Sequence, residues 1–240
     1  MSTLFISDLH LKPEASHLGR ILLDWLAGPA TGADALYVLG DLFDAWPGDD
    51  DAGDPFNAPV IRGFRALSDR GIPLYFQHGN RDFLLGAEFA RATGGTLLAE
   101  ELVTDLHGTP TLLMHGDQLC TDDAGYQQFR AQVRNPAWQQ SMLLRPLAAR
   151  KQLARQLREG SDVAKSGKST DIMDVNAEAV AAAFRRHGVG RMIHGHTHRP
   201  ARHVHAVDAR VCERFVLADW REAGAYLEVN ASGIAAHSIE

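Results

Sequence analysis

The chain begins Met1-Ser2-Thr3-Leu4-Phe5-Ile6-Ser7-Asp8-Leu9-His10, a short apolar run followed at once by polar residues. We interpret it as a buried β-strand whose end carries Asp8 and His10. Because these two residues are two positions apart on an extended strand end, their side chains point to the same side. The segment has no basic stretch, long apolar stretch or cleavage site, so we expect no signal peptide.

The same arrangement recurs along the chain. Polar clusters begin near positions 8, 41, 80 and 115, in steps of 33, 39 and 35 residues, each about one strand–helix–strand unit. The predicted strands are Thr3–Ser7, Ala35–Leu39, Pro73–Gln77, Thr111–Met114, Arg191–Ile193, Phe215–Leu217 and Ala225–Val229. Amphipathic helices are predicted at His17–Leu26, Val60–Leu67 and Ala177–Phe184. This alternation predicts an α/β core of parallel strands whose carboxyl ends share one edge, where ligands bind.

Composition indicates a globular protein of a reducing compartment. The 240 residues fit one large domain, or one domain with an insertion, and 45% hydrophobic with 22% charged residues excludes a disordered chain. No stretch approaches the ~18 to 20 apolar residues of a membrane span. The net charge of -6 argues against a general nucleic-acid binder. Two cysteines, Cys120 and Cys212, cannot build a disulfide framework, which favours the cytoplasm.

A basic, leucine-rich segment interrupts the pattern. Arg134–Lys168 carries eight basic and two acidic residues, so its charge is +6 and that of the remaining chain is -12. We predict a helical insertion at about 122–169, above the sheet edge. Two interpretations stay open: an ordinary surface helical hairpin, or a lid over an anionic, partly apolar ligand or a membrane surface.

Side chains at the predicted strand ends form a candidate metal site. The candidate ligands are Asp8, His10, Asp41, Asn80, His115, His196 and His198. Three oxygen ligands and four imidazoles are too many for one ion and suit two ions that share a carboxylate. This mixture favours Mn²⁺ over calcium, which prefers oxygen alone, and over structural zinc, which prefers cysteine. Glycines beside the ligands are expected to let the backbone turn sharply there; they are Gly40, Gly79, Gly116 and Gly195.

The ordered set of clusters resembles the calcineurin-like metallophosphoesterase superfamily. The resemblance rests on Asp8-Leu9-His10, Gly40–Asp44, Gly79–Asp82, His115–Asp117 and Gly195–His198. It implies a four-layer αββα sandwich with two metals and, between them, a water or hydroxide that acts as the nucleophile. It implies that one ion is held by Asp8, His10, Asp41 and His198. The second would be held by Asp41, Asn80, His115 and His196, with Asp41 bridging.

Arg81 departs from the superfamily pattern, because many members carry there a histidine that protonates the leaving group. An alkoxide leaving group needs a proton donor, whereas a phosphate ester with a pKa near 6 does not. A guanidinium instead suits bidentate binding of a second phosphate. Arg81 therefore indicates a diphosphate substrate; the alternative is a salt bridge to a neighbouring aspartate.

A longer resemblance, over residues 3–220 and including the insertion, is to the UDP-2,3-diacylglucosamine pyrophosphatase family of lipid A biosynthesis. It rests on Ile6–Leu11, Gly79–Phe83, His115–Asp123, Ile172–Asn176 and Ile193–Pro200. It implies hydrolysis of UDP-2,3-diacylglucosamine to UMP and 2,3-diacylglucosamine 1-phosphate, with two Mn²⁺ per chain and water attacking the α-phosphorus. The implied catalytic residues are Asp41, Asn80, Arg81 and His115. The implied substrate residues are Asn80, Arg81, Asp123, Ser161, Lys165, Lys168 and His196.

One further departure is Ala218 before Asp219-Trp220, where this family more often has glycine; we expect packing only. The acylated substrate and the basic insertion predict peripheral attachment to the cytoplasmic face of the inner membrane. No nucleic-acid partner and no obligate protein partner are expected. Two other functions are alternatives to this hydrolase activity: a nucleotide or cyclic-nucleotide phosphodiesterase, and a binding module that has lost catalysis. The presence of all seven candidate ligands disfavours the binding module.

Overall fold

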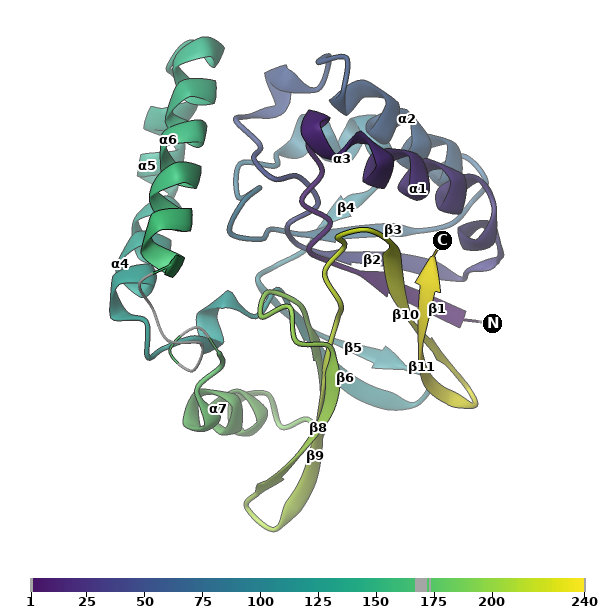
Figure 1. Ribbon diagram of the computed structural model, residues 1–240. Helices are drawn as coiled ribbons and strands as arrows, with labels where there is room; N and C mark the ends of the chain where they lie inside the picture. The colour runs from purple at the N-terminus through teal and green to yellow at the C-terminus, as the bar shows by residue number, and fades with distance from the viewer. Residues whose placement is uncertain (1, 167–171, 173, 240) are drawn as a thin grey trace.

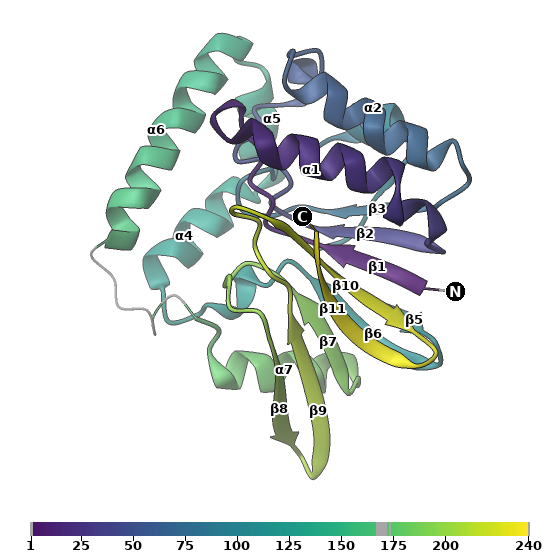
Figure 2. The ribbon, with the colours of Figure 1, turned by 45° about the vertical axis from the view of Figure 1, so that its right-hand side comes forward.

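The computed structural model describes residues 2–166, 172 and 174–239, and it shows four layers (Figures 1 and 2). Helices α1 (Ser16–Ala27), α2 (Asn57–Ser68) and α3 (Ala87–Thr93) cover the outer face of a six-stranded sheet. A five-stranded sheet packs against the inner face, and α7 (Ala177–His187) covers its far side. The layers follow the order helix, sheet, sheet, helix, which confirms the predicted αββα fold.

The first sheet has the strand order β11-β10-β1-β2-β3-β4. Its strands are β1 (Ser2–Ile6), β2 (Ala35–Leu39), β3 (Leu74–Gln77), β4 (Thr96–Leu97), β10 (Gly224–Asn230) and β11 (Gly233–Ile239). Strands β1 to β4 are parallel, whereas β10 and β11 run antiparallel at one side. The parallel part is the arrangement that the strand–helix–strand spacing predicts.

The second sheet has the order β5-β6-β7-β9-β8. Its strands are β5 (Glu101–Leu106), β6 (Thr109–Met114), β7 (Arg191–His194), β8 (Ala201–Val207) and β9 (Arg210–Val216). The prediction of a single shared edge is therefore wrong, because the strands before His115 and His196 belong to another sheet. The chain passes to the second sheet between β4 and β5. Strand β5 then turns back into β6 through His107 and Gly108, which both have positive φ, as a tight hairpin requires.

Alternation along the inner strands explains why two sheets pack together. Leu4 and Ile6 of β1 face the helices, while Phe5 lies between the sheets. In β6, Leu112 faces α7 and Leu113 faces the first sheet. Strands buried on both faces read as continuous apolar runs, which is why these strands were visible in the sequence.

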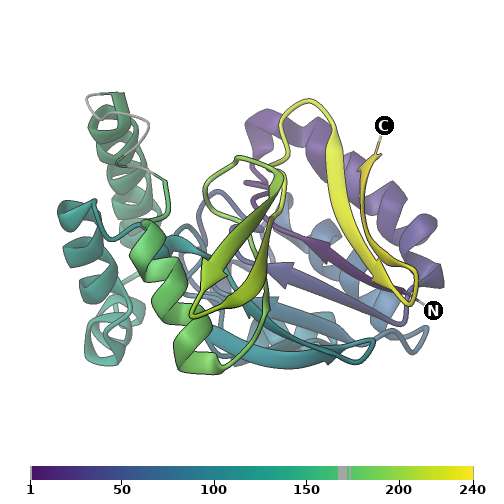
Figure 3. The ribbon, with the colours of Figure 1, turned by 90° about the horizontal axis from the view of Figure 1, so that it is seen from below.

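Helices α4 (Ala124–Val133), α5 (Pro136–Leu143) and α6 (Leu147–Ser166) stand together on the side opposite the chain termini (Figures 1 and 3). Four short 3₁₀ helices complete the described part: η1 (Pro13–Ala15), η2 (Pro29–Gly32), η3 (Asp49–Asp51) and η4 (Asp117–Leu119). Across the described residues, no helix has both the length and the apolar character to cross a membrane.

Residues 44–54, here called the acidic loop, hold α6 in place. Lys151 Nζ lies 2.6 Å from Oδ1 of Asp51 and 3.0 Å from Oδ2 of Asp54. Arg150, which is buried, donates to Asp50 and to the carbonyl of Pro47, and Arg158 pairs with Asp44. Several cations that the sequence assigned to a ligand or membrane are thus paired within the protein.

Candidate metal centre and adjoining cavity

The seven predicted metal ligands meet where the carboxyl ends of the two sheets come together. Five strands of two sheets carry them: β1 precedes Asp8 and His10, β2 Asp41, β3 Asn80, β6 His115, and β7 His196 and His198. We call these seven residues the strand-end cluster. Backbone hydrogen bonds join the loops, from Asp8 N to Gly40 O at 3.1 Å and from Gly195 N to His115 O at 2.9 Å.

One half of the strand-end cluster gathers around His198. Its Nε2 lies 3.2 Å from Nε2 of His10 and 3.4 Å from Oδ1 of Asp8. One potential ligand atom from each of these residues lies within 4.8 Å of the others. Asp8, His10 and His198 are therefore close enough together to surround one cation.

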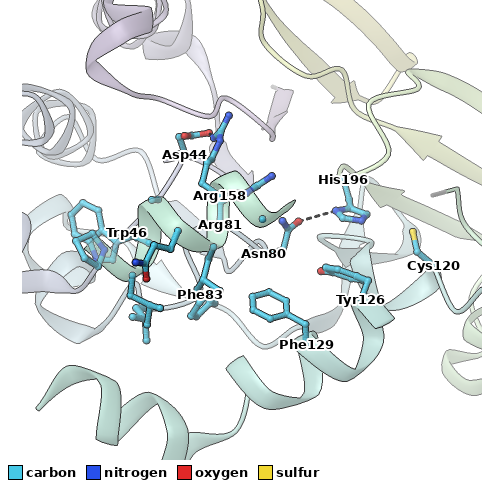
Figure 4. Close-up of a pocket in the computed structure, with 18 of the residues that line it drawn as sticks. Asp44, Trp46, Asn80, Arg81, Phe83, Cys120, Tyr126, Phe129, Arg158 and His196 are labelled. Carbon is cyan, nitrogen blue, oxygen red and sulfur yellow. Dashed lines mark hydrogen bonds and ion pairs between the residues drawn. The ribbon is translucent and has the colours of Figure 1, made fainter. Parts of the chain in front are cut away.

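The other half gathers around Asn80. Its Oδ1 lies 3.1 Å from Nε2 of His115 and 2.9 Å from Nδ1 of His196 (Figure 4). Asp41 stands between the halves, because its Oδ2 is 3.8 Å from both Nδ1 of His10 and Nε2 of His115. A carboxylate in this position faces both halves of the cluster.

The donor set fits a divalent cation. Asp8 and Asp41 are 0% and 2% exposed, and buried carboxylates are costly unless a cation or hydrogen bonds compensate them. Among the described residues, neither Oδ1 of Asp8 nor Nδ1 of His10 has a hydrogen-bond partner. Carboxylate, amide and imidazole donors together suit metals such as manganese.

Burial and neighbouring charges together set the protonation of the strand-end cluster. Burial lowers the pKa of His10 and of His196 to about 3, so both rings are neutral at pH 7 and have a lone pair for a metal. Burial, with repulsion from Asp82 and Asp8, raises the pKa of Asp41 to about 6 against the effect of His115. Burial also works to raise the pKa of Asp8, but the contact with His198 and the neighbouring imidazoles hold it below its ordinary value.

The backbone aims these side chains through an uncommon conformation. Positive φ values are rare outside glycine and concentrate at functional sites. Five of the seven residues have them: Asp8 (55°), His10 (48°), Asp41 (53°), His196 (69°) and His198 (54°). The loops thus bend sharply directly after their strands, which turns the side chains toward one point.

Glycines let the loops approach one another. A Cβ atom on Gly79 would lie 2.0 Å from Oδ1 of Asp41, and one on Gly195 would lie 2.2 Å from Oδ2 of Asp8. The sequence predicted sharp turns at four glycines. Gly40 and Gly116 have φ of 90° and 115° and fit that prediction. At Gly79 and Gly195 glycine is needed for another reason, because a side chain there would collide with Asp41 or Asp8.

Asp82 organises the centre, a role that the sequence did not reveal. Its Oδ1 accepts from Gly79 N at 2.8 Å and Asp41 N at 3.3 Å, and its Oδ2 accepts from Leu42 N at 2.8 Å. This buried carboxylate therefore ties the loop after β2 to the loop after β3. The three donors are brought together only by folding, so the residues next to Asp82 in the sequence give no signal of this role.

Hydrogen bonds on the far side of the rings orient two histidines. Nδ1 of His115 is 2.8 Å from the carbonyl of Leu39, so a proton on Nδ1 leaves Nε2 free toward Asn80 and Asp41. His194, the residue before the Gly195–His198 loop, places Nδ1 2.8 Å from the carbonyl of Gly195. A partner of this kind fixes the tautomer and orientation of an imidazole that is a candidate metal ligand, as His115 is.

A cavity of about 740 Å³ opens beside the strand-end cluster (Figure 4). Arg81 and two members of the strand-end cluster, Asn80 and His196, line its polar end. The opposite walls are apolar and come from the acidic loop, the loop after β3, and α4 to α6: Trp46, Phe83, Phe129, Trp138, Leu153 and Leu157. The cavity therefore joins a charged end to an apolar chamber.

The predicted substrate residues fall in different places. Asn80, Arg81, Asp123 and His196 line the cavity. Asp123 also caps α4, because its Oδ1 accepts from Tyr126 N at 3.0 Å. Ser161 and Lys165 fall in the range of α6, but their side chains, and the whole of Lys168, lie outside the described part of the chain.

Tyr126 and Arg158 also line the cavity, although they were not among the predicted substrate residues. The Tyr126 ring stacks on His196 with centroids 5.8 Å apart, and its hydroxyl donates to Asp117 at 2.7 Å. Cys120 lines the cavity too, but burial raises the pKa of its thiol to about 12. A thiol this weakly acidic is no nucleophile at pH 7.

Known proteins resemble this chain in sequence and in fold. Residues 1–200 match the family model of the calcineurin-like phosphoesterases. A UDP-2,3-diacylglucosamine hydrolase of Aromatoleum aromaticum is 52% identical over 233 residues, which cover 97% of this chain and 95% of that protein. One of Salmonella arizonae is 50% identical over 234 residues, covering 98% and 97%. The solved structure of an archaeal phosphodiesterase covers both chains completely with a TM-score of 0.50 at 11% identity, a likeness of fold.

The sequence matches, the four-layer fold and the donor set of the site all point to the same family. The family match and the donor set together show a metal-dependent hydrolase with a divalent cofactor. The match extends over the insertion as well as the two sheets, since it covers nearly the whole of each relative. The chain belongs to the calcineurin-like phosphoesterases and, within them, to the UDP-2,3-diacylglucosamine hydrolase family.

Proposed function

We propose that this chain hydrolyses the diphosphate of UDP-2,3-diacylglucosamine, giving UMP and 2,3-diacylglucosamine 1-phosphate in lipid A biosynthesis. One observation carries the proposal: a single cavity runs from the strand-end cluster and Arg81 to apolar walls. A substrate with two phosphates and two acyl chains needs both ends. The relatives at 50% and 52% identity bear the name of this activity.

The proposed cofactor is two Mn²⁺ per chain. Asp8, His10, Asp41 and His198 would hold one ion, and Asp41, Asn80, His115 and His196 the other. Bound there, the metal supplies Lewis acidity and lowers the pKa of the attacking water. The separation into two halves around His198 and Asn80, with Asp41 between them, supports this division.

The chain's own residues bind and orient the diphosphate. Asn80 and His196 stand at the polar end of the cavity, where they face the α-phosphate as water attacks its phosphorus. Arg81 holds the second phosphate, and its charge stabilises the departing phosphate ester. Such a leaving group, with a pKa near 6, departs without a proton donor.

Residues 1–240 are proposed to form one metallophosphoesterase domain, with residues 122–169 as its lid. Helices α4 to α6 support this proposal because Phe129, Trp138 and Leu153 supply apolar walls of the cavity. Burying acyl chains against such walls is favourable by about 25 cal/mol per Å². Asp123, Ser161, Lys165 and Lys168 are proposed substrate contacts from this segment.

Release of UMP from UDP-2,3-diacylglucosamine by the purified chain with Mn²⁺ tests the proposal. We expect rapid release that a chelator abolishes and that Mn²⁺ restores. UDP-glucosamine without acyl chains serves as the matched substrate and should react poorly, because it leaves the apolar walls uncovered. Turnover of a simple phosphodiester without UMP release would instead favour the phosphodiesterase alternative.

Attachment to the cytoplasmic face of the inner membrane is the proposed location. Leu143 and Leu144, at the turn between α5 and α6, are 45% and 83% exposed, and Arg145 follows them. Exposed apolar residues beside a cation suit the surface of an anionic bilayer. Replacing both leucines by serine should reduce co-flotation with anionic vesicles, whereas Val211→Ser, at a residue 74% exposed in β9, should not. Equal flotation of both variants would contradict the location.

A further inference from the structure

The segment after β9 brings a carboxylate to the strand-end cluster. Leu217 N donates to the carbonyl of His194 at 2.8 Å, and Trp220 N donates to the carbonyl of Asp8 at 3.0 Å. Asp219 lies between these two anchors. Its position is therefore fixed relative to two ligand-bearing loops that come from different sheets.

The Asp219 side chain faces one edge of His198. Its Oδ2 lies 3.3 Å from Nδ1 of His198, and the carboxylate is 12% exposed. The opposite ring nitrogen, Nε2, lies 3.2 Å from Nε2 of His10 and 3.4 Å from Oδ1 of Asp8. A neutral imidazole carries one proton, so a proton on Nδ1 leaves the lone pair of Nε2 directed at the cluster.

We propose that Asp219 is a positioning residue for the metal centre. It accepts the Nδ1 proton of His198 and thereby fixes the tautomer and ring orientation in which Nε2 binds a divalent ion. The inference rests on the metal site of the proposed function and deepens it. From the sequence we expect the departure at Ala218 to affect packing only, and no role for Asp219 is predicted; the neighbouring Trp220 is packed, being 2% exposed.

Arg221 offers a structural alternative that an experiment separates. Its Nε donates to Oδ2 of Asp219 at 2.7 Å, but its side chain is 75% exposed. An exposed ion pair of this kind contributes little to stability. If Asp219 served only this pair, removing either partner would have the same effect.

The test titrates metal-free protein with MnCl₂ by calorimetry, without substrate. Asp219→Ala should lower the affinity of one of the two sites by about 10- to 100-fold and leave the other unchanged. Asp219→Asn keeps an acceptor oxygen without the charge and should fall between the wild type and Asp219→Ala. Arg221→Ala should bind as the wild type does. Melting temperatures of the metal-free variants should match, which separates positioning from loss of fold.

Wild-type Mn²⁺ affinity in Asp219→Ala, or equal losses in Asp219→Ala and Arg221→Ala, would overturn the inference. A wild-type chain that binds no Mn²⁺ would overturn the proposed cofactor together with it. If the wild type binds Mn²⁺ but releases no UMP from the acylated substrate, the proposed substrate fails and the role of Asp219 still stands on the calorimetry.

Discussion

The strand-end cluster and helix α6 border the same cavity but are held in place differently. In the cluster, Asp8, Asp41 and His115 are at most 2% exposed and sit on loops that other backbone segments tie down. Helix α6 is fastened by long side chains, Arg150 and Lys151, to the acidic loop.

The two kinds of support fit the two functions of the site. Metal ligands must keep their geometry within a fraction of an ångström, and the proposed ligands lie at the junction of two sheets. Helix α6, which supplies a wall of the cavity, depends instead on side-chain contacts with the acidic loop. We therefore expect changes in the strand-end cluster to abolish chemistry, and changes at α6 to weaken substrate binding.

The largest effect is expected from Asp41→Ala. Because Oδ2 of Asp41 is 3.8 Å from ligand nitrogens in both halves, its loss disturbs both proposed ions. We expect kcat to fall by at least about 10³-fold, near 4 kcal/mol of transition-state stabilisation. Steady-state kinetics with Mn²⁺ measures this, with Asp69→Ala, an exposed carboxylate paired with Arg65, as the control. Full activity of Asp41→Ala would remove the bridging role.

The next largest effect is expected on stability from Asp82→Ala. The change leaves the N–H groups of Gly79, Asp41 and Leu42 without their acceptor in a buried place. We expect the free energy of unfolding of the metal-free protein to drop by about 3 kcal/mol in urea denaturation.

Asp105→Ala is the matched control for Asp82, since Oδ1 of Asp105 accepts from one exposed N–H, that of Gly108. It should cost less than about 1 kcal/mol. If both variants lose the same free energy, burial of the Asp82 network adds nothing, and the contrast between the cluster and exposed loops fails.

The sequence predicted the parts of the fold and site whose signals are local. Inner strands such as β1 and β6 are buried on both faces, so they appear as apolar runs, and the candidate ligands follow them directly. Strands β8 and β11 were not predicted, because most of their residues are exposed or half-buried and form no apolar run.

Features that depend on folding escaped prediction. The family resemblance implied two sheets, but neither the polar-cluster spacing nor the apolar runs indicated that the chain changes sheets between β4 and β5. Asp82 and Asp219 act on groups far away in the chain, such as Leu42 and His198. Their identities carry no mark of that contact, since an aspartate on a loop is usually exposed.

A smaller effect, on substrate binding, is expected from Arg150→Ala. The guanidinium holds α6 to Pro47 and Asp50 and also donates to the carbonyl of Arg145 at 2.9 Å. Without it the wall formed by Leu153 and Leu157 is less well held. We expect KM for the acylated substrate to rise about tenfold, or 1.4 kcal/mol, with Mn²⁺ affinity unchanged. The exposed Arg155→Ala on the same helix is the control; a fall in kcat at constant KM would contradict the separation of roles.

The smallest effect is a pH dependence at the attachment of α6. The hydrogen bond from Arg150 holds the pKa of Asp50 below its ordinary value of 3.8. A lowered carboxyl pKa stabilises the folded state above 3.8, and this contribution is lost as the pH falls through the lowered pKa. Asp50 is 56% exposed, so the pair contributes less than about 1 kcal/mol. Amide hydrogen exchange should show α6 up to about fivefold more protected in the wild type than in Asp50→Asn at pH 6. The two proteins should converge as the pH falls below 3.8 and through the lowered pKa of Asp50. A difference that does not narrow over this range would assign the protection to something other than the Asp50 charge.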